Sequence, residues 1–336
     1  MESNNSSLLS IIIPAYNVER YIKECLASIF SGISKEKLSL LEVIVVNDGS
    51  SDGTRAILES YENRGQIILL NQENRGQSNA RNNGLRIAKG KYVMFVDSDD
   101  YLWNDSLSRL IDFLAANEDV DIVEYGFYER WGNSEDIADK LEVPDVTSGD
   151  GQSVFAAWTS GRFFRALAWS RIVSRGLLMD NHIFFYEGIF HEDEEWCPRT
   201  FAYAAKVVFL PLHVYVYRIR RGSIMRSMSI KNYFDMLKVC DSLYNFAATP
   251  GFSKKYVNSL RSACASLYLA SIAGVKAKGR YDEGLIKELK GRSCILDYSD
   301  KVKRRWLYQY AIKAFGIKGF YFLKYALKDY LFPKKS

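Results

Sequence analysis

The chain has 336 residues, of which 48% are hydrophobic and 25% are charged, so it is long enough for a large core and two domains. Its formal net charge of +5 is too small to indicate nucleic-acid binding, and its five cysteines, which form no C-x-x-C pair, argue against a disulfide framework and favour a reducing compartment. The first residues lack the features of a secretory signal, and no apolar run approaches the roughly 20 residues of a membrane span, so we expect a cytoplasmic protein.

The first 130 residues alternate between apolar strands and amphipathic helices. The predicted strands are Leu8–Ile13, Leu40–Val46, Ile67–Leu70, Tyr92–Val96 and Ile122–Tyr125. Helices are expected after each of the first three, ending near Gly32, Tyr61 and Arg86. Short connections between alternating strands and helices indicate right-handed βαβ units, so we expect an α/β fold with a Rossmann-like, mainly parallel sheet flanked by helices.

Polar clusters begin where four of these strands end. They cover residues 14–17, 47–50, 71–81 and 97–100, whereas the amino ends of the strands carry plain sequences such as KLS, RGQ and AKGK. Ligands of open α/β sheets bind outside the carboxyl ends of the strands. The four clusters therefore predict one binding site at this edge.

Three carboxylates, Asp97, Asp99 and Asp100, directly follow the apolar run 92–96. Carboxylates this close repel one another unless a cation neutralises them. Mg²⁺ or Mn²⁺ prefers such hard oxygen ligands and completes its shell with substrate phosphates. The alternative is that Asp99 and Asp100 cap the next helix, and the fragment alone does not decide between the two. The neighbouring clusters favour the metal site.

The other clusters have both a binding and a local structural interpretation. Tyr16 can stack on a base, and Asp48 can accept hydrogen bonds from a base or ribose, although N-D-G is also a strong turn signal. Asn79 and Arg81 lie near a helix start, which is a natural anion site, although Arg81 could equally be a solvated charge. Neither a dinucleotide fingerprint nor a P-loop is present.

The ordered segments SIIIPAYN, VIVVNDGSSDGT, NRGQSNARNNG and GKYVMFVDSDDYL resemble the family-2 glycosyltransferases, which are inverting nucleotide-sugar enzymes with the GT-A fold. The match covers about the first third of the chain. It implies that Asp99 and Asp97 form the D-x-D element for Mg²⁺ or Mn²⁺. Together with the clusters above, it implies that the nucleotide, usually a uridine, is bound by Pro14, Tyr16, Glu19, Asp48, Asn79, Arg81 and Asp97.

A second acidic cluster, His191–Glu195, follows an aromatic run. Carboxylates favour a helix start, which explains part of this cluster. Apolar surroundings also raise the pKa of a carboxylate, as a general base requires. The family carries a matching E-D element whose Asp is the base. By resemblance the base is therefore Asp193, with Glu192 and His191 on the acceptor side.

The segments around this cluster are less regular. Residues 131–151 are expected to be a loop, 153–164 a helix, and 166–178 alternate only loosely. Edge strands are predicted around Pro211 within 207–217. The basic loop that follows resembles a family loop that closes over the diphosphate, with Arg218, Arg221 and Ser223 as candidate contacts, although it could equally be a mobile surface loop.

The remainder is predicted to be helical, over 233–247, 253–277, 282–290 and 303–331. Basic and aromatic residues interleave from 301 onward, which suits an anionic membrane surface, although the same face could pack on the catalytic domain. We therefore expect a GT-A catalytic domain over 1–230, divided near 103 into a nucleotide-binding half and an acceptor half, and a helical extension over 231–336.

The predicted function is transfer of a sugar from a nucleotide-diphosphate donor, most simply a UDP-sugar, to a hydroxyl of a glycan or lipid-linked glycan. Inversion and a divalent metal are expected, and nucleic acid is not a partner. Two alternatives stay open, a nucleotidyltransferase and a non-catalytic nucleotide-binding module. The first should carry a basic Gly-rich signature near its first strand, where this chain reads PAYNVER; the second would be expected to have lost Asp99 or Asp193.

Overall fold

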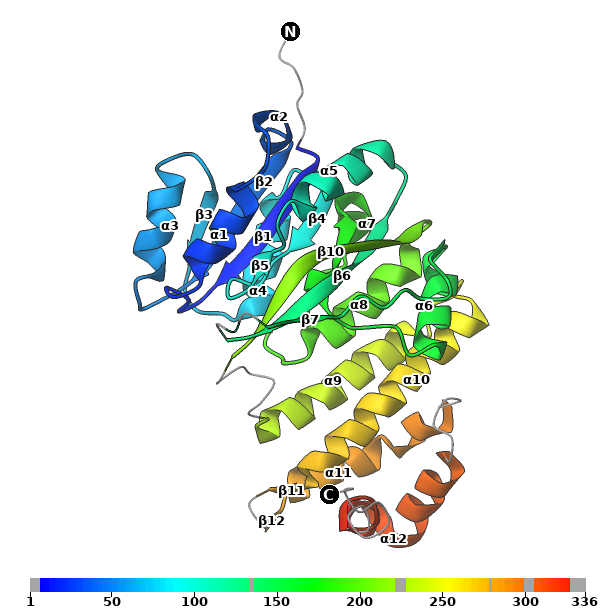
Figure 1. Ribbon diagram of the computed structural model, residues 1–336. Helices are drawn as coiled ribbons and strands as arrows, with labels where there is room; N and C mark the ends of the chain where they lie inside the picture. The colour runs from blue at the N-terminus through cyan, green and yellow to red at the C-terminus, as the bar shows by residue number, and fades with distance from the viewer. Residues whose placement is uncertain are drawn as a thin grey trace. The chain divides into compact units, whose positions relative to one another are not determined.

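A computed structural model describes residues 7–132, 134, 136–220, 228–277, 280–298 and 305–326 (Figure 1). The chain forms two compact units. Unit 1 comprises Met1–Gly188 and Glu192–Ser223, and unit 2 comprises Ile189–His191 and Ile224–Ser336. Each unit has its own buried apolar residues and is described separately below.

Unit 1 is built on one sheet whose first half is parallel. Its strands stand in the order β3-β2-β1-β4, with every neighbouring pair parallel. The elements of this half are β1 (Leu9–Ala15), α1 (Ile22–Phe30), α2 (Lys35–Leu38), β2 (Leu41–Asp48), α3 (Thr54–Glu62), β3 (Ile68–Gln72), α4 (Gln77–Ile87) and β4 (Tyr92–Phe95). The predicted βαβ alternation is confirmed for these residues.

The second half of the sheet is mixed. It continues β4-β9-β6-β10-β5, where β6 and β10 are parallel and β9 runs antiparallel to both of its neighbours. Its strands and helices are β5 (Tyr101–Leu102), α5 (Ser106–Ala116), β6 (Ile122–Trp131), β7 (Ile137–Asp139), β8 (Ser148–Gly149), α6 (Gly151–Ser160), η1 (Ala168–Ser170), β9 (Arg171–Ser174), α7 (Arg175–Asp180), α8 (Glu192–Tyr203) and β10 (Val207–Ile219). The four longest ladders are parallel, so the sheet is mainly parallel but interrupted by β9.

Two local predictions need correction in this half. β10 was expected as edge strands, but it is one continuous strand between β6 and β5. The sheet tolerates Pro211 there because the register with β6 shifts between Leu210 and His213, so the missing N–H of the proline leaves no ladder bond unmade. Residues 131–151 were expected to be only a loop, yet β7 pairs with β6 and β8 pairs with β10.

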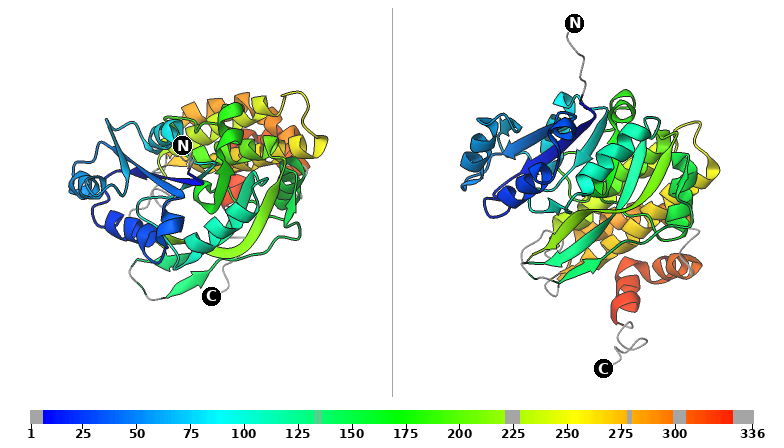
Figure 2. Two further views of the ribbon diagram at one scale, coloured as in Figure 1. Left: turned by 90° about the horizontal axis from the view of Figure 1, so that it is seen from above. Right: turned by 45° about the horizontal axis from the view of Figure 1, so that its top comes forward.

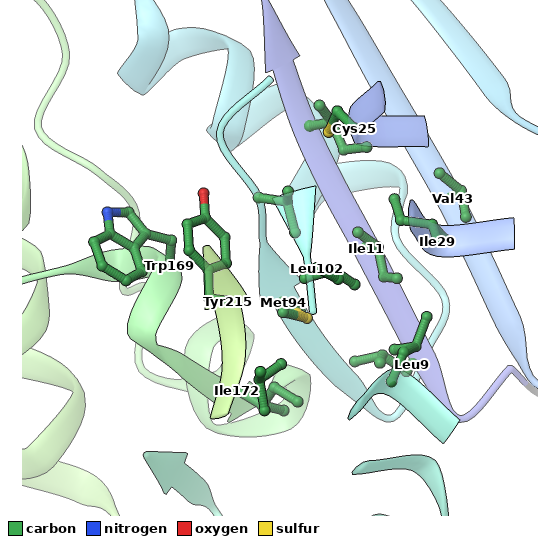
Figure 3. Packing of buried hydrophobic residues seen from close by; sticks show 14 of the residues in the cluster. Leu9, Ile11, Cys25, Ile29, Val43, Met94, Leu102, Trp169, Ile172 and Tyr215 are labelled. Carbon is green, nitrogen blue, oxygen red and sulfur yellow. The ribbon is translucent and has the colours of Figure 1, made fainter. Parts of the chain in front are cut away.

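Helices cover both faces of the parallel half (Figures 1 and 2). Alternate residues of β1, including Leu9 and Ile11, pack in one cluster with side chains of α1, α3 and α5. Figure 3 shows these residues against Cys25 and Ile29 of α1. Ile12 points to the other face, where it lies against Gly84 of α4. Because both faces are covered, the strands read as continuous apolar runs.

Unit 2 is mainly helical, as predicted. It contains α9 (Ile230–Phe246), α10 (Lys254–Ser271), η3 (Ile272–Val275), β11 (Lys276–Ala277), β12 (Arg280–Tyr281), α11 (Glu283–Gly291), η4 (Ser293–Tyr298) and α12 (Arg305–Ala326). The last helix is not continuous as expected, because Gly316 has a φ of 66° and kinks it. Residues 327–331 of that prediction lie outside the described residues. Among the described helices, none combines the length and the apolar character needed to cross a bilayer.

Candidate active site

The loops after β1 and β2 are tied together at the carboxyl edge of the sheet. Glu19 accepts a hydrogen bond from the Gly53 backbone N–H at 2.7 Å, and Asn17 accepts one from the Ser51 N–H at 2.8 Å. Pro14 is buried within β1, whereas the Tyr16 side chain next to it is 49% exposed. Tyr16 is thus available to stack on a planar ligand, and Glu19 fixes the loop that presents it.

Asp48 ends β2 and shapes the loop before α4. Its two carboxylate oxygens accept the backbone N–H groups of Arg75 and Gly76, each at 2.8 Å, and the group is almost fully buried. Gly76 has a φ of 88°, a backbone conformation that glycine adopts at low cost. Asp48 therefore fixes the start of α4. Its predicted contact with the nucleotide stays a prediction.

Asn79 bonds to a carboxylate that the sequence analysis missed. Its Nδ2 donates to Glu187 at 2.8 Å, and the Nδ2 of Asn82 donates to the other oxygen of Glu187 at 2.9 Å. The Glu187 side chain is still 42% exposed. Its position in the aromatic run before the second acidic cluster was the one available signal.

Arg81 is the centre of the site. It was expected near the base and diphosphate or as a solvated charge, but its side chain is only 1% exposed. Its guanidinium donates to Asp97 at 2.8 Å and to Glu192 and Asp193 at 3.0 Å each. The solvated-charge interpretation is therefore wrong, and the helix α4 carries a buried cation that joins two separate acidic clusters. Its nucleotide contact is untested.

The acidic residues 192–195 of the second cluster form the first turn of α8, so the predicted helix start is confirmed there. Asp193 also accepts the backbone N–H of Ala168 at 3.1 Å through its second oxygen. Burial raises the pKa of Asp193, and burial together with the Asp193 charge raises the pKa of Glu192 to about 7. A carboxylate of raised basicity at the site edge has the properties of a general base.

The D-S-D-D loop separates into exposed and buried carboxylates. Asp100 is buried and accepts hydrogen bonds from the Tyr215 hydroxyl at 2.8 Å and the Arg218 backbone N–H at 2.7 Å. Asp97 and Asp99 keep 19% and 24% of their side chains exposed. The capping alternative is wrong, since the following helix α5 begins at Ser106 and its N-cap is Asp105.

Asp97 and Asp99 fit a hard divalent cation. Both offer carboxylate oxygens, and burial followed by the charge of Asp97 raises the pKa of Asp99. In the described part of the chain, Oδ2 of Asp97 has no hydrogen-bond partner, although no cluster of three or more metal-ligating side chains occurs there. Proteins usually bind Mg²⁺ through one or two carboxylates, and substrate phosphates complete its coordination shell.

Two arginines of β10 and its end contact this loop. Arg218 was predicted on the diphosphate, but its buried guanidinium donates to the Asp99 carbonyl at 3.0 Å and to Glu24 at 2.6 Å. Arg220, which the sequence analysis did not single out, pairs with the Asp99 carboxylate at 2.7 Å. The predicted contacts Arg221 and Ser223 lie outside the described residues. His191 belongs to unit 2 and has a φ of 65°.

Comparison with known proteins identifies relatives over part of the chain. Residues 10–162 match the family described as "Glycosyl transferase family 2". The "Uncharacterized glycosyltransferase EpsJ" of Bacillus subtilis is 34% identical over 220 residues, which cover 65% of this chain and 62% of the relative. The chain thus spans less than two thirds of the length of that curated relative.

Two solved structures share the fold. The Staphylococcus aureus TarS fragment 1–349 in complex with UDP-GlcNAc has a TM-score of 0.70 and 20% identity, covering 96% of this chain and 91% of that chain. The mannosyltransferase PcManGT of Pyrobaculum calidifontis, in complex with GDP-Man and Mn²⁺, has a TM-score of 0.52 and 19% identity, covering 97% and 88%. These likenesses establish the GT-A fold.

Proposed function

Because the chain belongs to glycosyl transferase family 2, we propose that the protein transfers a sugar, with inversion, from a nucleotide-diphosphate donor to an acceptor hydroxyl. The observation that supports this most is the Arg81 cluster. It places the candidate base Asp193 and the candidate donor-site carboxylate Asp97 on one guanidinium. Sugar transfer requires the base and the donor-binding residues to lie close enough to contact the acceptor and the donor at the same time.

The proposed donor is a UDP-sugar. Tyr16 supplies an exposed ring for the base, and Asp48 and Glu19 fix two further loops at the carboxyl edge of the sheet. UDP-GlcNAc in the TarS structure supports uridine, whereas GDP-Man in PcManGT makes guanosine the competitor to test. Arg218 and Arg220 are placed at the end of β10, next to the predicted diphosphate loop.

Asp99 and Asp97 would hold Mg²⁺ or Mn²⁺, which would supply positive charge to the diphosphate leaving group. In the transfer step, Asp193 accepts the proton of the acceptor hydroxyl. The acceptor oxygen forms a bond to the anomeric carbon from the face opposite the leaving group, and the bond from that carbon to the diphosphate oxygen breaks. The burial that raises the pKa of Asp193 makes its carboxylate a stronger proton acceptor.

The proposed acceptor is a glycan or lipid-linked glycan, met at the cytoplasmic face of an anionic membrane. From residue 301 onward the sequence has ten Lys and Arg residues and one acidic residue, Asp329, interleaved with aromatic residues. Phe315 and Phe322 of α12 are 61% and 60% exposed. We assign residues 1–230 to catalysis, with the nucleotide half ending near 103, and 231–336 to this surface.

Calorimetric titration tests the donor site. UDP and GDP are titrated into the wild type and Asp99→Ala, each in Mn²⁺ and in EDTA. We expect UDP to bind more tightly than GDP in Mn²⁺, and Asp99→Ala in Mn²⁺ to bind UDP no better than the wild type in EDTA. Equal binding of UDP and GDP would overturn the uridine assignment.

Product analysis tests the reaction itself. Incubation with a panel of UDP-sugars and hydroxyl acceptors is expected to release UDP in the wild type, and Asp193→Asn is expected to release it about 10²–10⁴ times more slowly while binding UDP normally. Release of inorganic diphosphate from UTP and a sugar phosphate, incubated in parallel, would instead identify a nucleotidyltransferase. Binding of UDP without release of any product, from any UDP-sugar and acceptor tested, would identify a binding module.

A further inference from the structure

A fully buried arginine with three carboxylate partners is not explained by a nucleotide contact. The Arg81 guanidinium lies 5.0 Å from the centre of the Phe185 ring, which covers it, and no more than 1% of its side chain is exposed. Its two terminal nitrogens donate to Asp97, Glu192 and Asp193, whereas the buried Nε has no hydrogen-bond partner among the described residues. Burial lowers the pKa of Arg81, but the charges of Asp193, Asp97 and Glu192 outweigh this and raise it, so the cation is permanent.

Asp193 and Asp97 are each held by a second contact, the first through its carboxylate and the second through its backbone. Asp193 accepts the Ala168 N–H, and the Asp97 backbone N–H donates to the Tyr215 hydroxyl at 3.0 Å. Trp169, next to Ala168, stacks on Tyr215 with ring centres 4.4 Å apart and planes 15° apart (Figure 3). A second route of contacts therefore joins Asp193 to Asp97, parallel to the one through Arg81.

We infer that Arg81 is a positioning residue, which holds the base Asp193 at a fixed distance from the donor-site carboxylate Asp97. This rests on the proposed function. A guanidinium suits the role because its rigid fork can donate to several carboxylates at once, whereas an ammonium is a point charge on a flexible stem. The role predicts an effect on the rate of transfer, with little effect on donor affinity.

The test is the separation of rate from affinity in Arg81→Lys. We measure UDP release from the UDP-sugar that the wild type consumes, and UDP affinity by calorimetry. Misplacement of the base by about 1 Å is expected to lower kcat roughly 100-fold. UDP affinity is expected to stay within about threefold of the wild type, because the interaction acts on the transition state.

Two controls keep the result interpretable. Arg55→Lys makes the same chemical change at an exposed i,i+4 pair with Glu59, and it is expected to leave both quantities unchanged. Melting temperatures show whether Arg81→Lys folds. If it does not, Arg81→Gln, which keeps donors and removes the charge, is measured in the same way and carries the same expectation.

The outcomes distinguish failure of the positioning role of Arg81 from failure of the proposed transfer reaction. A loss of UDP affinity that parallels the loss of kcat would show that Arg81 binds the diphosphate and would overturn the inference, as would an unchanged kcat. A wild type that releases UDP from no donor contradicts the proposed transfer reaction. In that case the UDP affinity of Arg81→Lys can still overturn the inference, because a tenfold loss would place Arg81 on the nucleotide.

Discussion

The Tyr215 hydroxyl donates a hydrogen bond to the Asp100 carboxylate across 2.8 Å, and it accepts one from the Asp97 backbone N–H at 3.0 Å. Tyr215 lies in β10, 115 residues after Asp100. Both side chains are buried, so neither partner can turn to water instead. One hydroxyl thus fixes both ends of the D-S-D-D loop from a distant strand.

Removing that hydroxyl should therefore affect both stability and the cation site. Tyr215→Phe removes one partner from the buried Asp100 carboxylate and from the partly buried Asp97 N–H, and we expect it to lower the free energy of unfolding by about 1–3 kcal/mol. We also expect weaker binding of UDP in Mn²⁺, since the backbone of the whole D-S-D-D loop, which carries both Asp97 and Asp99, loses the hydroxyl that fixes it. Denaturant titration and calorimetry measure the two effects.

Tyr61→Phe is the control, because the Tyr61 hydroxyl has no hydrogen bond within the described residues. Equal stability of the two variants would contradict the assignment.

Arg220 would compete with the proposed divalent cation for Asp99. The ion pair between Arg220 and Asp99 is 2.7 Å long and about a third exposed on the arginine side, and such pairs contribute roughly 0.2–1 kcal/mol. Arg220→Gln removes the competitor, so we expect Mn²⁺ to bind about one and a half- to fivefold more tightly in the absence of nucleotide. Titration followed by the electron paramagnetic resonance of free Mn²⁺ gives the affinity. Weaker Mn²⁺ binding in this variant would show that Arg220 does not oppose the cation.

The parallel half of the fold could be predicted because its signals are local. Each strand is a short apolar run followed by a polar cluster, and the Ile22–Ile29 face of α1 repeats with helical spacing. The position of β9 could not be predicted in this way. Its four residues follow a long segment with little regular pattern in the sequence. Its insertion between β4 and β6 depends on pairings with residues far away in the chain.

The candidate site likewise has a part that local sequence signals could predict and a part that they could not. The sequence indicated which carboxylates gather at the sheet edge, because each group follows a strand or an aromatic run. It could not show that Arg81 of α4 would be buried between Asp97 and Asp193, which lie 16 and 112 residues away. It also could not separate Asp100 from Asp99, since only the three-dimensional contact with Tyr215 makes Asp100 a buried structural residue.

A buried ion pair between β6 and β9 is expected to be structural. Glu124 and Arg171 face each other in the strand register, with 5% and 0% of their side chains exposed, and the Arg171 Nε lies 3.0 Å from Glu124. Glu124→Leu leaves the arginine charge buried and should cost about 3–5 kcal/mol in the free energy of unfolding. The double variant Glu124→Leu/Arg171→Met should recover most of that loss. If it is no more stable than the single variant, the cost does not come from the unpaired charge.

Glu194 makes stability depend on pH. Burial, followed by the charge of Asp193, raises its pKa from 4.5 to about 7. Between these two values the folded state binds more protons than the unfolded state, so stability falls as pH rises. Glu194 therefore stabilises the folded state by about 1–3 kcal/mol below about pH 4.5. This stabilisation is lost as the pH rises past about 7. Glu194→Gln should flatten the dependence of the melting temperature on pH between 5 and 8, leaving the part that Glu192 contributes. Parallel curves for the two proteins would rule out this role.

Gly84 allows α4 to approach β1, and it lies one turn after Arg81 on the same helix. A Cβ at this position would lie 2.5 Å from the Ile12 Cγ2, closer than two such atoms approach. Alanine normally stabilises a helix interior by about 1 kcal/mol relative to glycine, but overpacking a core costs about 1–3 kcal/mol. At an approach of 2.5 Å we expect the cost of the clash to exceed the gain in helix propensity. We expect Gly84→Ala to lower the melting temperature, and to lower kcat because α4 carries Arg81 away from Asp193.

Two variants identify the cause. Gly291→Ala in α11 introduces a Cβ that meets no atom within 4 Å among the described residues outside its own stretch of backbone, so it should leave stability unchanged or slightly higher. Ile12→Ala removes the clashing Cγ2, and its combination with Gly84→Ala should lose less stability than the sum of the two single losses, because neighbouring substitutions that fill and empty the same space are coupled. Additive losses in the double variant would show that Gly84 is required for some reason other than the contact with Ile12.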